Sequence, residues 1–256
     1  AGTGPALPIL EYDDASEAMI EPRHVFGRRE GVPRAMVICF FAEIVDEVCA
    51  EGRADVVLQL GMESPRPLYS LDIGRGRRVA VLHPGVGAPM VTSLMEEAIA
   101  LGCERFVACG GAGALVPGLA LGHVVVPNAA VRDEGTSYHY LAPEREVAAD
   151  PDAVAVAVAV LERNGVPHTV AKTWSTDAPF RETAARVERR RAEGCVTVEM
   201  ETAAFFAVAR HRGVRFTQYL YAGDDLSGEA WDHRSWQAWS SRRALFDLAV
   251  EACLEL

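Results

Sequence analysis

Short apolar segments alternate with amphipathic segments along most of the chain. The continuous apolar runs at residues 35–41 and 55–60 are typical of strands that are buried on both faces. The other predicted strands cover residues 68–73, 78–83, 105–109, 121–127, 129–132, 168–173, 196–198 and 216–221. The predicted helices cover residues 42–51, 90–101, 151–162, 181–191, 203–209 and 234–256. This alternation predicts an α/β fold in which helices flank a central β-sheet.

The first 34 residues do not follow this alternation. They carry prolines, glycines and mixed charge without periodicity, so residues 1–34 are predicted to form an irregular N-terminal arm. Residues 35–256 are predicted to form one α/β domain, since a chain of this size can be built around one hydrophobic core.

Charge and composition limit the kinds of partner. The formal net charge is −11, and an acidic chain repels phosphate backbones and anionic lipids, so neither nucleic acid nor a membrane is an expected partner. No apolar run approaches the ~20 residues that are needed to cross a bilayer. The first fourteen residues also lack the basic and apolar regions of a signal peptide.

Cysteine and histidine usage points to an intracellular protein without a metal. The six cysteines are far apart and form no CxxC pair, which is typical of free thiols in a reducing compartment. We therefore expect a cytoplasmic protein. The histidines are dispersed and lack the spacing of metal ligands, so neither a metal nor an organic cofactor is predicted.

The segment 195–210 is the strongest candidate for a site. A β-type run leads here into a helical pattern, and Glu199 and Glu201 flank Met200 at the boundary. Ligands of open α/β sheets bind at the carboxyl ends of strands, where a carboxylate can accept hydrogen bonds from two neighbouring hydroxyl groups. The alternative is structural: both glutamates solvate the strand end and start the helix, where negative charge is favoured.

Two glycine-rich segments follow predicted strands, at residues 83–89 and 110–115. The first is predicted as a turn from strand to helix, in which Gly85 and Gly87 expose backbone N–H groups to a ligand. The second is predicted as a turn whose glycines allow the close approach of a ligand or of a crossing strand. Both segments lack the third glycine of a dinucleotide fingerprint, which argues against a nicotinamide-dependent oxidoreductase.

Taken together, these segments resemble the nucleoside phosphorylases and nucleosidases of the single-domain α/β type, which include purine nucleoside phosphorylase, uridine phosphorylase and methylthioadenosine nucleosidase. The resemblance rests on five segments in the same order: residues 110–115, 121–135, 175–180, 198–204 and the pair Gly223-Asp224. It implies a mixed central β-sheet, and an enzyme that cleaves the N-glycosidic bond of a nucleoside and releases the free base.

The resemblance also implies roles for individual residues. Met200 and Glu201 would line the sugar, with Glu201 binding the two ribose hydroxyls and Glu199 supporting that corner. Asp224 falls where purine-specific members carry the general acid, which implies a purine-type base. Such an acid must keep its proton near neutral pH, and the adjacent Asp225 is a candidate for the negative charge that this requires. Without the resemblance, the two aspartates are typical of an ordinary turn.

Further implications concern the base and the assembly. Phe180, or its neighbour Pro179, lies where the family stacks an aromatic ring on the base, and the turn at Gly85 and Gly87 would approach the base or sugar. The family is oligomeric, with sites completed by a neighbour. A homo-oligomer with shared active sites is therefore expected, and residues 1–34 are a candidate for a donated arm.

The chain departs from the phosphorolytic pattern at three places. One is the loop after the first strand, where many members carry a phosphate-binding arginine and residues 41–45 here contain no cation. Phosphorolytic members place an arginine before the glycine-rich segment and a Ser or Thr within it, whereas the matching positions here are Ala108 and Gly111. A phosphate dianion is poorly held without arginine. Nucleosidases also lack these residues and place a water-activating glutamate near the end of the first strand, where Glu43 is the matching candidate.

The sequence therefore favours hydrolysis, and two alternatives stay open. The first is phosphorolysis, with phosphate as co-substrate in a relocated site that uses Arg23, Arg75, Arg77 or Arg132. The second is a non-catalytic protein that binds a nucleoside.

Overall fold

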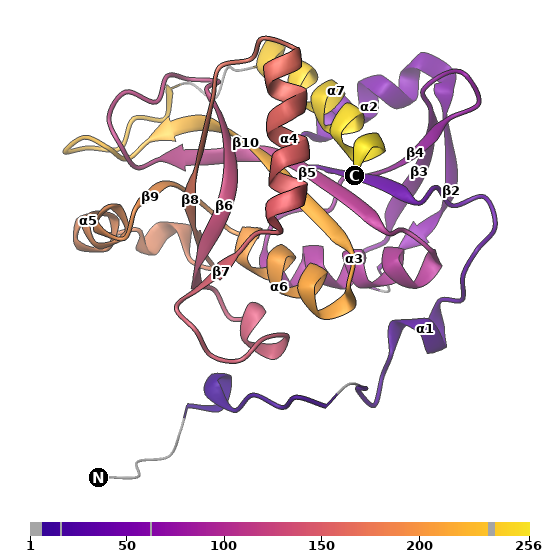
Figure 1. Ribbon diagram of the computed structural model, residues 1–256, viewed down its shortest axis with the longest axis horizontal. Coiled ribbons are helices and arrows are strands. Elements are labelled where there is room, and N and C mark those ends of the chain that lie inside the picture. Colours follow the sequence, from indigo (N-terminus) through magenta and orange to yellow (C-terminus); the bar gives the residue numbers. More distant parts are fainter. Residues whose placement is uncertain (1–6, 16, 62, 235–238) are drawn as a thin grey trace.

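The computed structural model describes residues 7–15, 17–61, 63–234 and 239–256, which form one mixed β-sheet with helices on both faces (Figure 1). The strands are β1 (Ala35–Cys39), β2 (Ala54–Leu60), β3 (Arg66–Asp72), β4 (Arg78–Leu82), β5 (Arg105–Ala114), β6 (Val124–Asp133), β7 (Glu146–Ala148), β8 (His168–Thr176), β9 (Cys195–Glu199) and β10 (Arg215–Asp225). The α-helices are α1 (Pro22–Val25), α2 (Ala42–Val48), α3 (Ala88–Leu101), α4 (Pro151–Arg163), α5 (Ala184–Ala192), α6 (Thr202–Arg212) and α7 (Trp239–Glu255). The short turns are η1 (Pro8–Leu10), η2 (Cys49–Arg53), η3 (Ser137–His139) and η4 (Pro179–Arg181).

Five strands of the sheet close into a ring. In the order β5, β10, β6, β8 and β9, each strand pairs with the next, and β9 pairs back with β5. The strands β1, β4, β3 and β2 extend from β5 as an open wing. Parallel and antiparallel pairs occur in both parts, so the predicted mixed sheet is confirmed.

Strand β1 shows why its apolar run is continuous. Val37 and Cys39 face a core that includes α2, α4 and α7, whereas Met36 and Ile38 face a second core that includes α3 and α6. Successive side chains of a strand point to opposite faces, so a strand covered on both faces needs apolar residues at every position.

The glycine-rich segment 110–115 is not a turn as predicted, because β5 continues through it to Ala114. Gly111 pairs with Tyr221 of β10, and a Cβ on Gly111 would stand 3.2 Å from the Tyr221 ring. A Cβ on Gly113 would stand 2.6 Å from Leu226 and 3.0 Å from Val198. The glycines therefore allow crossing segments to approach β5 closely, which is one of the two alternatives that the sequence left open.

Three other boundaries differ from the prediction. The predicted strands at 121–127 and 129–132 are one strand, β6, with a bulge between Pro127 and Ala129. β10 continues to Asp225, so Asp224 lies near a strand end. The last helix, predicted from residue 234, begins at 239 in the described part, and residues 235–238 lie outside it.

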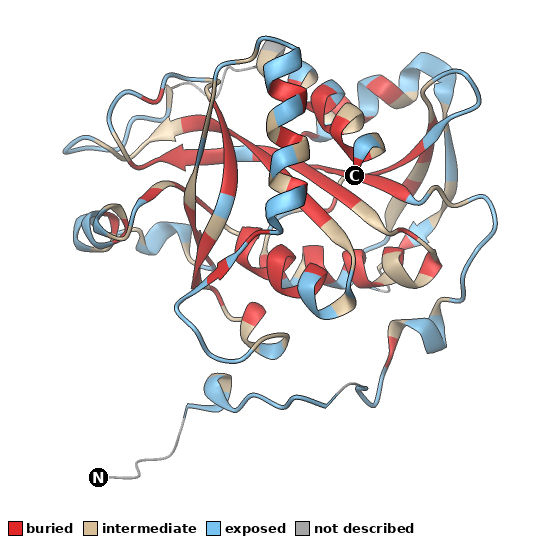
Figure 2. Cartoon of the chain, in the orientation of Figure 1, coloured by how far each residue is buried: buried red, intermediate tan, exposed pale blue. Residues whose placement is uncertain are grey.

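The N-terminal arm lies along the outside of the domain, and most of its described side chains are exposed (Figure 2). Glu21 is the buried exception, and it accepts a hydrogen bond of 3.1 Å from Arg212 of α6. The arm is therefore fastened to the helix layer at α6. Residues 1–6 and 16 of the predicted arm lie outside the described part.

Candidate functional site

The junction between β9 and α6 is organised by a buried carboxylate. Glu199 accepts hydrogen bonds from the Ser175 hydroxyl at 2.6 Å, from the Glu201 N–H at 2.7 Å and from the Thr202 N–H at 2.6 Å. The last two donors are backbone groups at the start of α6, so Glu199 satisfies N–H groups that the helix itself leaves unpaired. Glu199 thereby sets the direction in which Glu201 leaves the strand.

Glu201 connects this junction to the glycine turn between β4 and α3. Its Oε1 accepts a hydrogen bond of 2.6 Å from the Gly87 N–H, and its side chain is buried. Gly85 and Gly87 have φ values of 80° and 109°, a backbone region that strongly favours glycine. Burial raises the pKa of this carboxyl group, whereas the Met200 N–H also acts on it and lowers its pKa. Contact of the second oxygen, Oε2, with a sugar stays a prediction.

Burial changes the ionisation of both glutamates. It is the largest cause that raises the pKa of Glu201 to about 8, followed by the charge of Glu199, while the Gly87 N–H acts in the opposite direction. Burial also raises the pKa of Glu199, opposed by the Ser175 hydroxyl. Burial thus favours the neutral form of Glu201, and a neutral carboxyl can both donate to one hydroxyl and accept from another.

Asp224 lies next to the same strand ends. Its Oδ2 accepts a hydrogen bond of 2.7 Å from the indole N–H of Trp231, and its Oδ1 lies 3.3 Å from where a Cβ on Gly113 would stand. Gly113 is paired with Val198, the residue before Glu199. The structure therefore brings Asp224 to the end of β9 that carries Glu199.

Asp225, which the sequence suggested as the source of negative charge beside Asp224, already has partners of its own. Asp225 is ion-paired with Arg234 and accepts a hydrogen bond from the Ser227 N–H at 2.7 Å. Burial raises the pKa of Asp225, but the Ser227 and Arg234 hydrogen bonds outweigh it and lower the pKa overall. Asp225 is therefore a poor source of the charge that would keep Asp224 protonated.

Glu182, which the sequence analysis missed, is a second carboxyl group close enough to Asp224 to feel its charge. Burial, followed by the charge of Asp224, raises the pKa of Glu182 to about 7. Its carboxylate makes no hydrogen bond or ion pair within the described residues. The only signal in the sequence was its position, two residues after Phe180.

The two remaining ligand-binding candidates are accessible to solvent. Phe180 lies in η4 with its side chain fully exposed, at 100%. Met200 is half-buried between the two glutamates. Their contacts with base and sugar stay predictions.

Glu43 belongs to a different cluster. It forms an ion pair of 2.6 Å with Arg242 of α7, and the Arg242 guanidinium also donates to the Tyr221 hydroxyl at 3.0 and 3.1 Å. The Tyr221 ring lies against Gly111, so Glu43 is linked to β5 through two side chains. Its predicted role in activating water stays a prediction.

Ala108 and Gly111, the two positions that lack the arginine and the Ser or Thr of phosphorolytic members, have apolar surroundings. Ala108 is completely buried. The Phe40 ring lies 3.1 Å from where a Cβ on Gly110 would stand, and Tyr221 covers Gly111 in the same way. An oxyanion at this place would meet the Phe40 and Tyr221 rings, and Arg242, which donates to the Tyr221 hydroxyl, is already paired with Glu43.

Two of the four arginines suggested for a relocated phosphate site already have protein partners. Arg132 is buried and donates to the Ser137 hydroxyl and to the carbonyls of Ala142 and Leu141, at 2.9, 2.7 and 3.0 Å. Arg23 is exposed and ion-paired with Glu17. Arg132 therefore orders the segment after β6, and Arg23 makes its ion pair within the arm itself.

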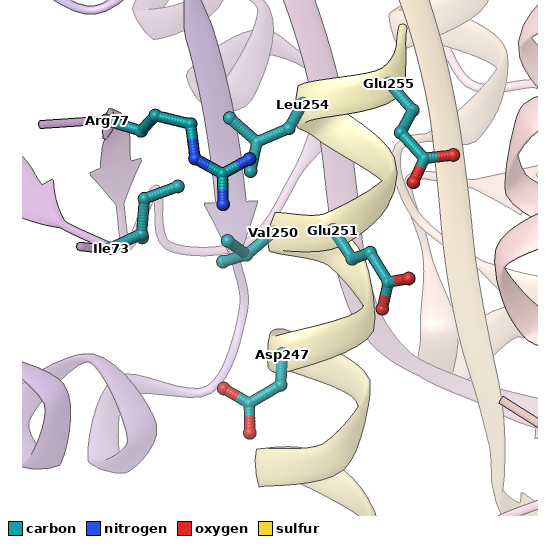
Figure 3. A pocket seen from close by; sticks show the side chains of 7 residues that line it. All are labelled: Ile73, Arg77, Asp247, Val250, Glu251, Leu254 and Glu255. Atoms are coloured by element: carbon teal, nitrogen blue, oxygen red, sulfur yellow. The ribbon is translucent and has the colours of Figure 1, made fainter. Parts of the chain in front are cut away.

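The other two arginines lie near the opposite end of the sheet. Arg75 and Arg77 belong to the hairpin between β3 and β4, near the start of β4, whereas Gly85 follows the end of β4. Arg77 faces a cavity of about 300 Å³ whose other charged lining residues are acidic (Figure 3). These acidic residues lie on α7 and are Asp247, Glu251 and Glu255. Their charge would repel a phosphate.

Comparison with known proteins assigns the chain to a family. A sequence model described as the phosphorylase superfamily matches residues 35–252. The chain belongs to this superfamily. The resemblance stated from the sequence is thereby confirmed.

Relatives of this superfamily member are distant. The chain is 33% identical over 140 residues to a guanosine phosphorylase of Halorubrum lacusprofundi, covering 55% of this chain and 58% of that protein. It is 34% identical over 104 residues to a uridine phosphorylase of Thermococcus kodakarensis, covering 41% of this chain and 38% of that protein. The chain thus spans less than two thirds of the length of these curated relatives.

Solved structures share the fold of this superfamily member. A uridine phosphorylase of Vibrio fischeri superposes with a TM-score of 0.74 at 21% identity, covering 94% of this chain and 100% of that one. A purine nucleoside phosphorylase of Toxoplasma gondii superposes with a TM-score of 0.76 at 18% identity, covering 88% and 92%. The predicted nucleoside phosphorylase-like fold is confirmed.

Two kinds of feature are absent from the described residues of this superfamily member. These residues contain no group of three or more His, Cys, Asp or Glu side chains that could hold a metal ion. Nor do they include a helix with the length and apolar character for crossing a bilayer.

Proposed function

We propose that the chain cleaves the N-glycosidic bond of a nucleoside by phosphorolysis, releasing a free base and a pentose 1-phosphate. The observation that carries the proposal is Glu201, a buried carboxyl group that the Gly87 N–H holds at the junction between β9 and α6. The names of the two relatives, a guanosine and a uridine phosphorylase, support phosphate as the acceptor.

The chemistry follows from the charges that develop in the transition state. A phosphate oxygen forms a bond to C1′ while the bond from C1′ to the base nitrogen breaks and leaves its electron pair on the base. Glu201 positions the sugar by hydrogen bonding to the ribose hydroxyl groups. Carboxyl oxygens beside the sugar favour the positive charge that develops on the sugar ring in the transition state. A proton reaches the departing base from the acidic pair Asp224 and Glu182, and the proton of hydrogen phosphate restores the balance.

We propose a purine-type base because a carboxylic acid at Asp224 can donate a proton to a purine nitrogen. Glu182 is the member of the pair whose pKa is raised, to about 7, by burial and by the charge of Asp224, since two neighbouring carboxylates resist ionising together. This supports proton donation near neutral pH.

We also infer a homo-oligomer with shared sites. The described arm exposes apolar side chains that a monomer would leave in water. These residues are Leu7, Leu10, Met19, Ile20 and Val25. Light scattering coupled to size-exclusion chromatography tests this, with a monomeric mass as the contradicting result.

Hydrolysis is the second candidate, and a specific observation favours it. Phe40 and Tyr221 cover the glycines of β5, and Ala108 stands where phosphorolytic members carry arginine. Water needs no cationic site there. Glu43 is then the candidate base, provided that it leaves Arg242.

The test is a panel of purine and pyrimidine nucleosides, incubated with and without phosphate, with released base measured by chromatography. We expect release that depends on phosphate and is largely lost in Glu201→Gln and Asp224→Asn. Glu97→Gln is the matched control, because Glu97 also accepts a glycine N–H, that of Gly61 at 2.8 Å. Release without phosphate would establish the hydrolytic alternative. Tight nucleoside binding without any release would support the non-catalytic alternative and overturn both.

A further inference from the structure

Trp231 lies beside Asp224, on the segment that follows β10. Its indole N–H donates the hydrogen bond of 2.7 Å to Asp224 Oδ2, whereas Oδ1 lies 3.3 Å from where a Cβ on Gly113 of β5 would stand. The two oxygens of the carboxyl group therefore have different surroundings. In a carboxylic acid the oxygen without the proton is the better acceptor, so the indole contact leaves Oδ1 as the oxygen that carries a proton.

A short closed loop holds Trp231 in this place. Asp225, the last residue of β10, and Asp232 exchange two backbone hydrogen bonds, of 2.8 and 2.9 Å, and thereby close the segment between them. At the start of this loop, the Leu226 N–H donates to the Ala114 carbonyl of β5 at 2.8 Å. Trp231 is the last residue before the closing pair, so its backbone position is set by β10 and β5.

Arg234 fastens the chain just after the same loop. It is ion-paired with Asp225 and donates to the Leu119 carbonyl at 2.8 Å. Its φ of 45° lies in the left-handed region, which residues other than glycine rarely adopt. Such strained backbone persists where surrounding contacts over-determine it, and it clusters at functional sites. The contacts of Arg234 therefore hold the loop, and Trp231 with it, in one conformation.

The direction of the hydrogen bond matters for the reaction. An indole N–H can only donate, so its contact with Asp224 strengthens as this side chain gains negative charge. In the proposed reaction Asp224 gains that charge when its proton passes to the departing base. An interaction that is stronger in the transition state than in the ground state raises kcat without changing the affinity for the substrate.

We propose that Trp231 is a positioning residue for Asp224. Its N–H orients the carboxyl group and stabilises the negative charge that remains when the proton moves from Oδ1 to a nitrogen of the base. The electron pair of the breaking bond to C1′ stays on the base, and the acceptor, phosphate or water, supplies the proton that returns to Asp224. This inference rests on the proposed function, because it needs Asp224 as a proton donor.

The experiment compares Trp231→Phe with Trp231→His in the full-length chain. The side chain of Trp231 is 60% exposed, so either replacement removes little packing. Trp231→Phe keeps an aromatic ring without a donor, whereas Trp231→His keeps a ring N–H, since Nε2 can occupy the place of the indole nitrogen. Trp174→Phe is the matched control, because the Trp174 indole N–H also donates to an aspartate, Asp133, at 2.9 Å. Thermal unfolding checks that each variant is folded.

We expect Trp231→Phe to lower kcat for release of the base by about 10- to 100-fold, the loss typical of a hydrogen bond to a charged group. KM for the nucleoside should stay unchanged, because the lost interaction acts in the transition state. Trp231→His should recover part of kcat, and Trp174→Phe should match the wild type. A wild-type kcat in Trp231→Phe, or a loss that appears only in KM, would overturn the proposal.

A second measurement tests the contact without turnover. In a proton–nitrogen correlation spectrum of protein labelled at tryptophan, the Trp231 indole signal is the one that is missing from Trp231→Phe. We expect this signal to shift in Asp224→Asn and to keep its position in Glu97→Gln. An identical signal in wild type and Asp224→Asn would overturn the proposal. A wild type that cleaves no nucleoside would instead refute the proposed function, while the spectrum would still decide whether Trp231 binds Asp224.

Discussion

Replacing Glu201 by Gln should make the folded protein more stable in alkaline solution, although it removes a site residue. Burial, together with the charge of Glu199, raises the pKa of Glu201 from an ordinary 4.5 to about 8. Between these two pH values the folded protein holds a proton that the unfolded chain has released. The stability of the wild type therefore falls as pH rises through this window, whereas a Gln at the same position cannot ionise.

The size of the effect follows from the same pKa. Each unit between the folded and unfolded values corresponds to about 1.4 kcal/mol, which sets an upper limit of about 5 kcal/mol once Glu201 is fully ionised. The Gly87 N–H continues to bind the ionised carboxylate and offsets part of the cost. We therefore expect Glu201→Gln to exceed the wild type by about 2–3 kcal/mol at pH 9 and to match it near pH 5.

The assay is denaturant unfolding of both proteins at a series of pH values between 5 and 9. Glu97→Gln serves as the control, since Glu97 also accepts a glycine N–H but is only half-buried. A constant difference between Glu201→Gln and wild type over the whole range would refute the reasoning. The reasoning would also be refuted if the stability of Glu201→Gln, measured relative to wild type, were lower at pH 9 than at pH 5.

Three further predictions address other parts of the structure. Gly113→Ala should lower the free energy of unfolding by about 1–3 kcal/mol, because the added methyl group collides with Leu226, and thermal or chemical unfolding measures this. Glu182→Gln should remove the fall in kcat/KM above about pH 7, because a group with that pKa is protonated, and able to donate, only below it. Arg132→Met should lower stability by about 1–3 kcal/mol through its lost hydrogen bonds and leave KM for phosphate unchanged.

Matched variants separate these effects from general damage. Gly135→Ala is the control for Gly113→Ala, since its added methyl group would make only ordinary contacts. Glu188→Gln, on exposed α5 surface, is the control for Glu182→Gln. The predicted collision at Gly113 would be contradicted if Gly113→Ala were as stable as wild type. The role of Glu182 would be contradicted by an unaltered pH profile of Glu182→Gln. The structural role of Arg132 would be contradicted by a large rise in KM for phosphate in Arg132→Met.

Local patterns were enough to predict most elements and the strand-to-helix junction at Glu199–Glu201. The switch from a β-type run to a helical pattern at Glu199–Glu201 is a short-range signal, and the structure has a strand end and a helix start there. The glycines of β5 were harder to interpret, because the sequence does not say whether a ligand or a strand fills the space above a glycine. At Gly111 the space is filled by Tyr221, which is 110 positions away in the sequence.

The parts that the sequence could not predict depend on contacts between distant residues. The ion pair between Glu43 and Arg242 joins positions that are 199 apart. Nor does the sequence show that the Nε of Arg66, the first residue of β3, is buried without an acceptor among the described residues. The preference for hydrolysis rested on single positions such as Ala108, whereas the named relatives support phosphorolysis.

The closed ring of five strands has a consequence for the solubility of the chain. Ring closure leaves β2 at the open end of the strand order, where unpaired backbone groups could recruit a strand from another molecule. β2 carries an irregular register between Val56 and Leu58 and an ion pair between Asp55 and Arg78. A distorted and charged edge strand resists edge-to-edge aggregation. The irregular register and the ion pair of β2 therefore protect the exposed edge of the sheet.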